Sequence, residues 1–370
     1  MIVYLLGRIL TVEAVLMAPS AVLAAIYGEG DLKAFLITML LLAVIGVALS
    51  FRRPKNSAIF AREGLVTVAA AWILISAFGA LPMVISGAIP SYIDALFEMI
   101  SGFTTTGASI VPLVEELPHG VLFWRSFSHW IGGMGILVFM LAIVRMDGGQ
   151  AIHLLRAESP GPTVSKMVPR MADSSKILYG IYFGLTVLQI LFYLAGGEPL
   201  LDSLCNAFGT AGTGGFGIKA DSIASYSHFC QWVITVFMLL FGVSFNMYYL
   251  LLIKRWREVL KSNELKCYLG ISLAAMIIIA LSIMPLCGSI ADAVRLSAFQ
   301  VSSIVTTTGY ATADFDAWPS LAKAVLLILM FFGGCMGSTA GGLKMSRVTV
   351  LAQIARNDLR HALRPREVSS

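Results

Sequence analysis

Long apolar runs separated by short polar segments dominate the pattern along the chain. Eight of these runs are long enough to cross a hydrocarbon core about 30 Å thick, which takes about 20 helical residues. They cover residues 3–26, 33–51, 64–86, 121–144, 177–197, 232–253, 267–287 and 322–346. The pattern predicts an all-α integral membrane protein with about eight transmembrane helices.

The composition supports this fold class. Apolar residues make up 58% of the 370 residues and charged residues only 13%, whereas a soluble domain has about 45–50% and about 25%. These proportions exclude a soluble enzyme, a disordered chain and a nucleic-acid binder. The five cysteines are scattered without a CxxC pattern, which argues against a disulfide framework and a zinc site.

The basic residues predict an orientation in the membrane. They gather in segments 52–62, 145–176, 254–266 and 344–366, which fall on one side when the eight runs are threaded in order. The loops on the other side carry mainly acidic residues. Because Lys and Arg are enriched in cytoplasmic loops, we expect a multi-pass protein of the inner (plasma) membrane with both termini in the cytoplasm.

Three shorter apolar segments do not fit the spanning pattern. Residues 91–106, 199–211 and 291–308 each lie on the outer side between two spanning runs and end in Thr and Gly. Apolar runs of about 10–14 residues are more often re-entrant than spanning. Irregular backbone at membrane depth is tolerated where it is buried in protein or lines a watery cavity. We therefore expect three re-entrant pore helices.

The ends of these segments repeat along the chain. Matching the glycines places them 105 residues apart (212 − 107) and then 97 apart (309 − 212). The matched turns are Thr105-Thr106-Gly107, Thr210-Ala211-Gly212 and Thr307-Thr308-Gly309. The repeat unit predicts an N-terminal transmembrane helix pair (1–52), three pore repeats (64–145, 175–257 and 264–347) and a cytoplasmic tail (348–370).

The chemistry of such a turn favours a cation. The C-terminal end of a half-helix carries about half a negative charge, and rings of backbone carbonyls can replace the hydration shell of a cation. No carboxylate lies in any of the three turns, and a divalent cation would favour carboxylate oxygens. The turns therefore predict backbone ligands for a monovalent cation, with no transition metal and no cofactor held by the chain.

A second candidate site lies inside the eighth apolar run. Five glycines in ten residues should break a helix, since each costs about 1 kcal/mol relative to alanine in a helix interior. Close packing of small residues is the alternative explanation. We favour an irregular intramembrane loop that gates the pathway. Its predicted gate residues are Gly333, Gly334, Gly337, Ser338, Thr339, Gly341 and Gly342.

Several of these motifs together resemble the TrkH potassium-uptake family, part of the Trk/Ktr/HKT superfamily. The resemblance runs from the first helix to about residue 347. The segments that carry it are residues 101–109, 129–135, 209–216, 306–319 and 333–344.

This resemblance implies four repeats around one pore, with one filter glycine per repeat that favours K⁺. A serine at the first such glycine is associated with Na⁺ transport in some HKT members. It also implies a homodimer that assembles with a cytosolic nucleotide-binding ring of the TrkA type, so that nucleotide acts only through that partner.

Some alternatives remain open at this stage. Only three filter repeats are found, so we expect a chain truncated before the fourth, and a non-conducting fragment of a K⁺ channel is one reading. A secondary cation transporter coupled to Na⁺ or H⁺ symport is another, and an enzyme is the weakest. Arg125 and His129, one helical turn apart in the fourth run, are expected to brace a pore helix through Glu98 rather than to contact the ion.

Overall fold

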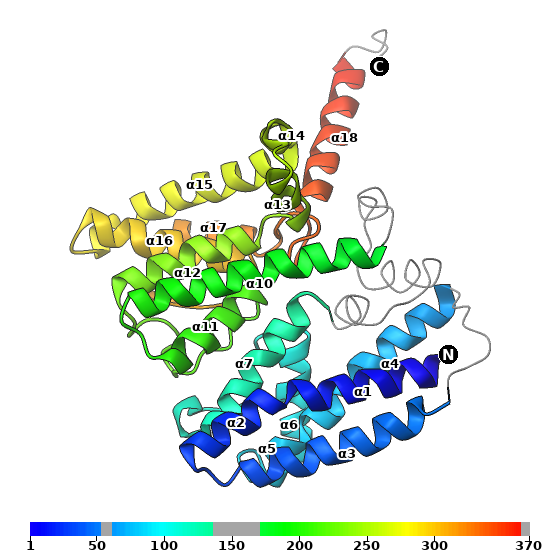
Figure 1. Cartoon of the computed structure of the whole chain (residues 1–370). Helices are drawn as coiled ribbons and strands as arrows, with labels where there is room; N and C mark the ends of the chain where they lie inside the picture. Colours follow the sequence, from blue (N-terminus) through cyan, green and yellow to red (C-terminus); the bar gives the residue numbers. More distant parts are fainter. Residues whose placement is uncertain (53–60, 136–170, 364–370) are drawn as a thin grey trace. The chain divides into compact units, whose positions relative to one another are not determined.

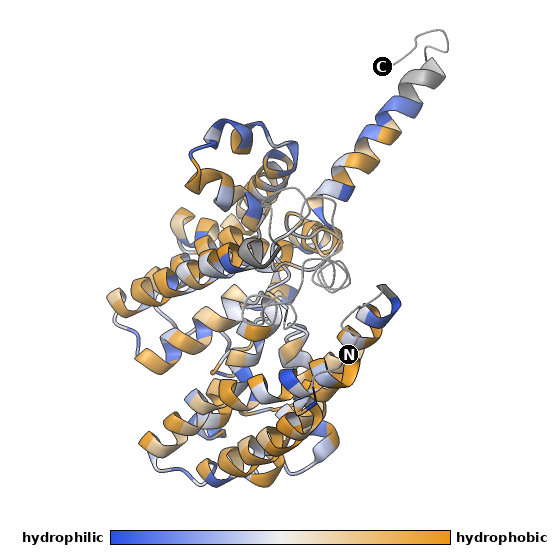
Figure 2. Cartoon of the chain, turned by 45° about the vertical axis from the view of Figure 1, so that its right-hand side comes forward, coloured by the Kyte–Doolittle hydropathy of each residue, from blue (hydrophilic) through white to orange (hydrophobic). Residues whose placement is uncertain are grey.

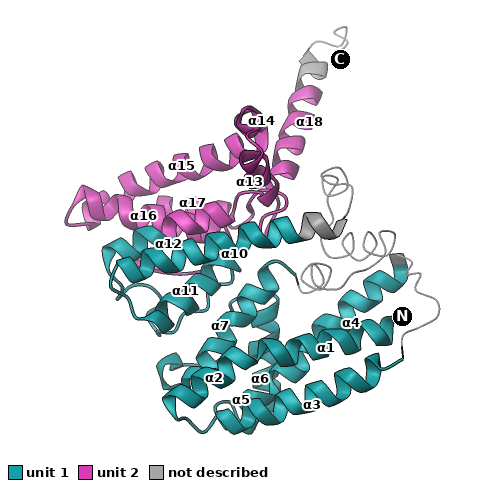
Figure 3. Ribbon diagram, in the orientation of Figure 1, with its two compact units in different colours: residues 1–234 teal, residues 235–370 magenta. Residues whose placement is uncertain are grey.

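The computed structural model describes residues 1–52, 61–135 and 171–363, which divide into two compact units (Figures 1 and 3). Unit 1 comprises residues 1–234 and unit 2 residues 235–370, so the boundary falls inside helix α12. The described residues form helices and turns, and the only β pairing among them is a single bridge between Phe332 and Leu343. The all-α fold class predicted from the apolar pattern is confirmed.

The helices up to the unit boundary belong to the N-terminal pair and the first two predicted repeats. They are α1 (Ile2–Leu16), α2 (Ala18–Tyr27), α3 (Leu32–Ser50), α4 (Ala61–Gly79), α5 (Leu81–Ile85), α6 (Tyr92–Phe103), the short η1 (Val114–Glu116), α7 (His119–Gly133), α10 (Met171–Ala195), α11 (Leu200–Ala211) and α12 (His228–Phe241).

The helices of unit 2 beyond α12 are α13 (Phe245–Leu252), α14 (Trp256–Lys261), α15 (Asn263–Ile283), η3 (Met284–Leu286), α16 (Ile290–Val305), η4 (Phe315–Ala317), α17 (Ser320–Leu329) and α18 (Met345–Leu363). Apolar residues colour most of the helical ribbon in Figure 2, whereas α18, which leads to the C-terminus, is more mixed.

Most of the predicted spans correspond to long apolar helices. Five described segments have the length and composition to cross a membrane: Ile2–Tyr27, Leu32–Ser50, Arg62–Ile85, Lys176–Ala195 and Asn263–Leu286. The predicted span 121–144 begins as α7, but its part beyond residue 135 lies outside the described residues, as do the basic residues counted for orientation between 136 and 170.

Two predicted spans are not continuous helices. The run 232–253 is divided into α12 and α13, which meet at an angle of 88° across residues 242–244. Averaged hydropathy could not show this break, because α12 and α13 together pass as one apolar segment despite Gly242 and Ser244 between them. The run 322–346 consists of α17, an irregular loop at residues 333–344 and the start of α18.

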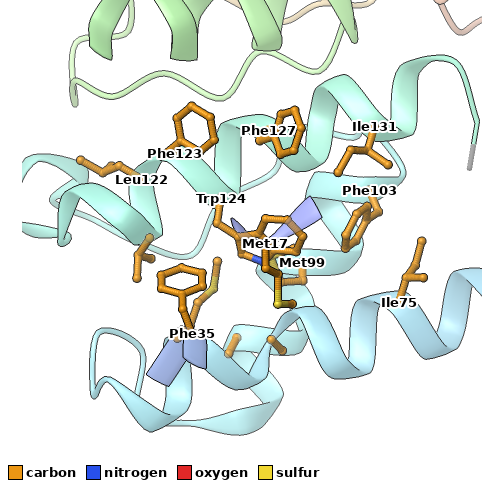
Figure 4. Close-up of a cluster of buried hydrophobic side chains, with 14 of the residues drawn as sticks. Met17, Phe35, Ile75, Met99, Phe103, Leu122, Phe123, Trp124, Phe127 and Ile131 are labelled. Atoms are coloured by element: carbon orange, nitrogen blue, oxygen red, sulfur yellow. The ribbon is translucent and has the colours of Figure 1, made fainter. Parts of the chain in front are cut away.

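The core of unit 1 packs the N-terminal helix pair against the first repeat. Small residues let α1 and α3 approach closely, since a Cβ at Gly7 would lie 2.8 Å from the carbonyl oxygen of Gly46. Met17, Met99 and Trp124 meet in the middle of the buried cluster (Figure 4). The Trp124 indole N–H donates to the carbonyl of Gly79 at 3.0 Å, so the polar end of this buried ring is satisfied.

Three half-length helices occupy the positions of the predicted pore helices. These are α6, α11 and α16, of 12, 12 and 16 residues. Serine side chains cap two of them: Ser91 Oγ accepts from the Asp94 amide, and Ser289 Oγ accepts from the Asp292 amide. Pro199 is the N-cap residue of α11 and supplies no side-chain cap.

Candidate functional site

Each half-length helix ends in a turn with the same backbone conformation. A threonine takes a positive φ in each turn, and the glycine two residues later does so as well. The threonines are Thr105, Thr213 and Thr307 (φ 55, 53 and 57°), and the glycines are Gly107, Gly215 and Gly309 (φ 77, 76 and 88°). The left-handed region costs a residue with a Cβ about 1–2 kcal/mol. Such strain, repeated at three equivalent places, indicates a backbone shape kept for function.

The three turns also share their hydrogen bonds to the helices before them. In each turn, the amide that follows the left-handed threonine donates to a carbonyl five residues earlier. The pairs are Thr106 to Ser101 (2.9 Å), Gly214 to Gly209 (3.0 Å) and Thr308 to Ser303 (2.9 Å). These bonds fix the register of the turns independently of residue type.

The geometry changes the register predicted for the second turn. The sequence match pairs Gly107 with Gly212, whereas the backbone pairs it with Gly215, three residues later. Thr210 and Ala211 still belong to α11, and Gly212 caps that helix with φ −74°. Residues 210–215 contain two successive Thr-x-Gly patterns. The first of them forms the C-terminal end and the cap of helix α11. The residues equivalent to Gly212 are the helix caps Thr104 and Thr306.

The first and second turns touch each other within unit 1. A Cβ added at Gly107 would collide with the carbonyl oxygen of Gly214. Helix α7 packs closely against the ends of α6 and α11. A Cβ at Gly132 of α7 would meet the Phe103 carbonyl of α6, and a Cβ at Gly212, the cap of α11, would meet the His129 carbonyl of α7. These contacts explain why small residues cluster in the segments 129–135 and 209–215.

A buried ion pair lies beneath these two turns. Glu98 of α6 and Arg125 of α7 are paired, with only 0% and 2% of their side chains exposed. The Glu98 carboxylate also accepts from Ser109 Oγ at 3.0 Å and from the Ile110 amide at 3.1 Å, just after the first turn. Arg125 donates to the Gly217 carbonyl at 2.9 Å, just after the second turn. The expected brace through Glu98 is therefore present and extends to both turns.

His129 lies against the second turn from the same face of α7. Its ring stacks on Phe216 with 4.1 Å between centroids, and its Nδ1 accepts from the Phe216 amide at 3.4 Å. The guanidinium carbon of Arg125 lies 3.7 Å from the centroid of that phenyl ring. Because a donor amide faces Nδ1, the neutral ring carries its proton on Nε2. Both residues therefore support the turn.

A further contact joins the loops that follow the first and second turns. Glu115, in η1, accepts from the Ala220 amide through Oε1 at 2.6 Å. This hydrogen bond, with a smaller contribution from the positive charge of Lys219, lowers the pKa of the Glu115 carboxyl from its usual value.

The third turn belongs to unit 2 and contacts the glycine-rich loop directly. The Gly341 amide of that loop donates to Thr307 Oγ1 at 2.7 Å. Ser303 Oγ, in α16, donates to the Tyr310 carbonyl at 2.7 Å and so joins the residue after the turn to the helix before it. One loop residue is thus held by the left-handed threonine of the turn.

The glycine-rich loop contains all seven predicted gate residues and is irregular along its length. Its first part is bonded to the break between α12 and α13: the Cys335 amide donates to the Gly242 carbonyl at 2.8 Å, and the Phe245 amide donates to the Gly337 carbonyl at 2.9 Å. Gly337 and Gly342 adopt φ values of 77° and 69°, which glycine alone adopts without strain.

The other gate residues close the loop on itself and onto α12. The Gly333 amide donates to the Leu343 carbonyl at 3.0 Å, and the Met345 amide donates to the Gly334 carbonyl at 3.2 Å. Ser338 Oγ donates to the Cys335 carbonyl at 2.7 Å, whereas the Thr339 hydroxyl makes a longer bond, 3.4 Å, to the Phe241 carbonyl.

Comparison with known proteins identifies the family of this chain. Residues 31–370 match the family model described as "TrkH: Cation transport protein". The chain belongs to the TrkH family. Members of this family are ion transporters and not enzymes.

Individual relatives agree with this assignment. The Trk system potassium uptake protein TrkG of Escherichia coli K12 is 32% identical over all of this chain and 77% of its own length. TrkH of Salmonella typhimurium is 34% identical over 94% of this chain and 73% of its own length. The crystal structure of the potassium transporter TrkH from Vibrio parahaemolyticus superposes with a TM-score of 0.87 at 30% identity, covering 100% of this chain and 77% of that one.

Sequence reasoning missed two parts of this candidate site. It placed the second turn three residues too early, although a match on the following Gly-Phe and Gly-Tyr pairs would have favoured Gly215 over Gly212. It also passed over Glu264, whose Oε1 accepts from the Met336 amide of the loop at 2.6 Å. Glu264 lies 72 residues earlier in the chain, and no local pattern links the two. Within the described residues, no group of three or more His, Cys, Asp or Glu is arranged to hold a metal ion.

Proposed function

We propose that this chain is the transmembrane subunit of a potassium uptake channel. In this proposal, backbone carbonyls of residues 105–107, 213–215 and 307–309 hold K⁺. The observation that carries it is the shared conformation of the three turns, each with two left-handed residues at the same spacing. The turn at 213–215 replaces Thr210-Ala211-Gly212 as the contribution of the second repeat.

The chemistry of the turns supports K⁺ as the ion. They contain only Thr and Gly, so their oxygen atoms are carbonyls and hydroxyls, without a carboxylate that would favour Mg²⁺ or Ca²⁺. Carbonyl ligands suit a weakly hydrated monovalent cation. Relatives that are 32–34% identical are named as potassium uptake proteins, which supports the same substrate here.

We further propose that the loop at residues 333–342 gates the pathway. Its hydrogen bond to Thr307 Oγ1 supports this role, because a loop attached to a filter turn lies where it can obstruct the ion.

The remaining parts of the proposal concern assembly and location. The subunit is a homodimer in the inner membrane with both termini cytoplasmic, and its basic cytoplasmic loops contact a TrkA-type nucleotide-binding ring. The distribution of Lys and Arg supports the orientation, and the homodimer and the ring are what the resemblance to the TrkH family implies.

Ion flux into proteoliposomes tests the proposal. Wild-type protein should take up K⁺ in preference to Na⁺, and Gly107→Ser should shift the preference toward Na⁺. Gly87→Ser is the control for backbone strain alone, because Gly87 has nearly the same φ (78°) but, unlike Gly107, has no described atom within 4 Å of a Cβ placed there. Unchanged selectivity in Gly107→Ser would remove Gly107 from the filter, and wild-type protein without K⁺ uptake would refute the function.

A further inference from the structure

The Glu264 carboxylate accepts two backbone hydrogen bonds at the glycine-rich loop and just after it. Its Oε1 accepts from the Met336 amide at 2.6 Å and from the Ser346 amide at 3.1 Å. Met336 lies inside the loop, and Ser346 lies in the first turn of α18. A single carboxylate oxygen therefore joins the loop to the start of the helix that follows it.

Glu264 lies where two helix N-termini supply hydrogen-bond donors. Glu264 lies in the first turn of α15, and the N-termini of both α15 and α18 present amide groups with partial positive charge. The first amides of a helix have no partner within it, so the Ser346 amide needs an outside acceptor. A carboxylate serves better than a neutral group, since hydrogen bonds to ions are about twice as strong.

Lys344 contributes a second, oppositely charged contact to the loop. Its Nζ donates to the carbonyl of Ala340, four residues earlier, and both Glu264 and Lys344 are half-buried. The Cys335 amide, next to Met336, is held by a neutral backbone bond to the Gly242 carbonyl. The charged groups that contact the loop are thus Glu264, at Met336, and Lys344, at Ala340.

We propose that Glu264 is a positioning residue that clamps the glycine-rich loop to the start of α18 and thereby restrains the loop. This inference rests on the proposed gating role of the loop. A displacement of α15 or α18 would be transmitted to the loop through the contacts of Glu264 with Met336 and Ser346. Release of the clamp frees the loop from its present conformation and raises ion flux without changing selectivity, because the clamp touches none of the three turns.

The native residue Cys335 provides a direct readout of the clamp. Its side chain is fully buried in the loop next to Met336, so its reaction with a small thiol reagent reports loop opening. The other four cysteines are replaced by serine, and this background is first checked for the flux of the wild type. Labelling is measured on the whole protein in detergent, and K⁺ flux in proteoliposomes.

Three variants separate the clamp from a general loss of structure. Glu264→Ala removes the acceptor and should speed Cys335 labelling and K⁺ flux about tenfold, the factor expected for one hydrogen bond to a charged group. Glu264→Gln keeps an acceptor oxygen without the charge and should restore most of the restraint, leaving about a threefold increase. Glu258→Gln changes an exposed carboxylate on α14 and should change neither rate.

The two readouts distinguish this inference from the proposed function. Wild-type labelling rates in both Glu264 variants would overturn the clamp. Faster labelling without faster flux would keep the clamp and refute the loop as the gate. If Glu264→Ala does not fold, Glu264→Gln decides the question, and a fall in its flux with a lower melting temperature and unchanged labelling would show a merely structural role.

Discussion

The buried pair of Glu98 and Arg125 allows a quantitative test of how the first two turns are supported. Removing one member of a buried ion pair leaves an uncompensated charge and costs about 3–5 kcal/mol. Arg125→Met would leave the Glu98 carboxylate with two neutral donors, Ser109 Oγ and the Ile110 amide. Glu98→Gln would leave the guanidinium with the Gly217 carbonyl and the Phe216 ring.

The double variant should be less damaged than the sum of its parts. With both charges gone, the loss is about 1–3 kcal/mol for the hydrogen bonds of Arg125, whereas two independent single losses would add to about 6–10 kcal/mol. For a unit of about 150–250 residues, 1 kcal/mol corresponds to about 2–4 °C in melting temperature. Each single variant should therefore melt about 6 °C or more below the wild type, and the double variant close to or above either one.

The assay is thermal unfolding in detergent, followed by tryptophan fluorescence, together with the K⁺/Na⁺ flux ratio. Arg255 and Glu258 serve as the control pair, because the same chemistry there is 57% and 47% exposed and surface pairs contribute about 0–1 kcal/mol. Both single variants at the buried pair should lose selectivity, since both turns lose a support. Strictly additive losses in the double variant would refute the coupling of the two turns through this pair.

Two further perturbations test the contact between Glu115 and Ala220 and the contact between Thr307 and Gly341. The lowered pKa of Glu115 means that its carboxylate stabilises the fold above the ordinary value of 4.5, and this contribution is lost as the pH falls through the lower folded value. Acidification below pH 4.5 should therefore lower the melting temperature of the wild type more than that of Glu115→Gln, and equal pH profiles would contradict the contact with Ala220. Thr307→Val removes the acceptor of the Gly341 amide and should speed Cys335 labelling. Thr105→Val, at nearly the same φ, should not, and equal rates would contradict the link between turn and loop.

The sequence predicted the helices well because hydrocarbon imposes a simple rule. A spanning helix must be apolar over about 20 residues, and five such segments appear where they were expected. The break at residues 242–244 followed no such rule. Its polar backbone groups are satisfied by the loop, as in the bond from Cys335 to the Gly242 carbonyl, and a partner about ninety residues away leaves no local trace in the pattern.

The three turns after the half-length helices were expected from the sequence, but the register of the second one was not. Residue types repeated clearly at Gly107 and Gly309, where Thr-Thr-Thr-Gly occurs in both copies. In the second copy, Gly212 is the cap of α11 and lies against the His129 carbonyl, so the first Thr-x-Gly pattern falls at the end of the helix. The residue that takes the left-handed conformation after it, Thr213, could not be chosen by composition.

The glycines of the first two turns have a role beyond conformational freedom. Gly107 needs both its positive φ and the space of a missing side chain. Gly214 of the second turn and Gly132 of α7 are required for space, because a Cβ at Gly214 would strike His129 and one at Gly132 the Phe103 carbonyl. Helix α7 therefore lies directly against both turns, with Arg125 and His129 filling the interval between them. In such packing a side-chain change on α7 displaces two turns together, so under the proposed function we expect changes on this helix to alter K⁺/Na⁺ selectivity.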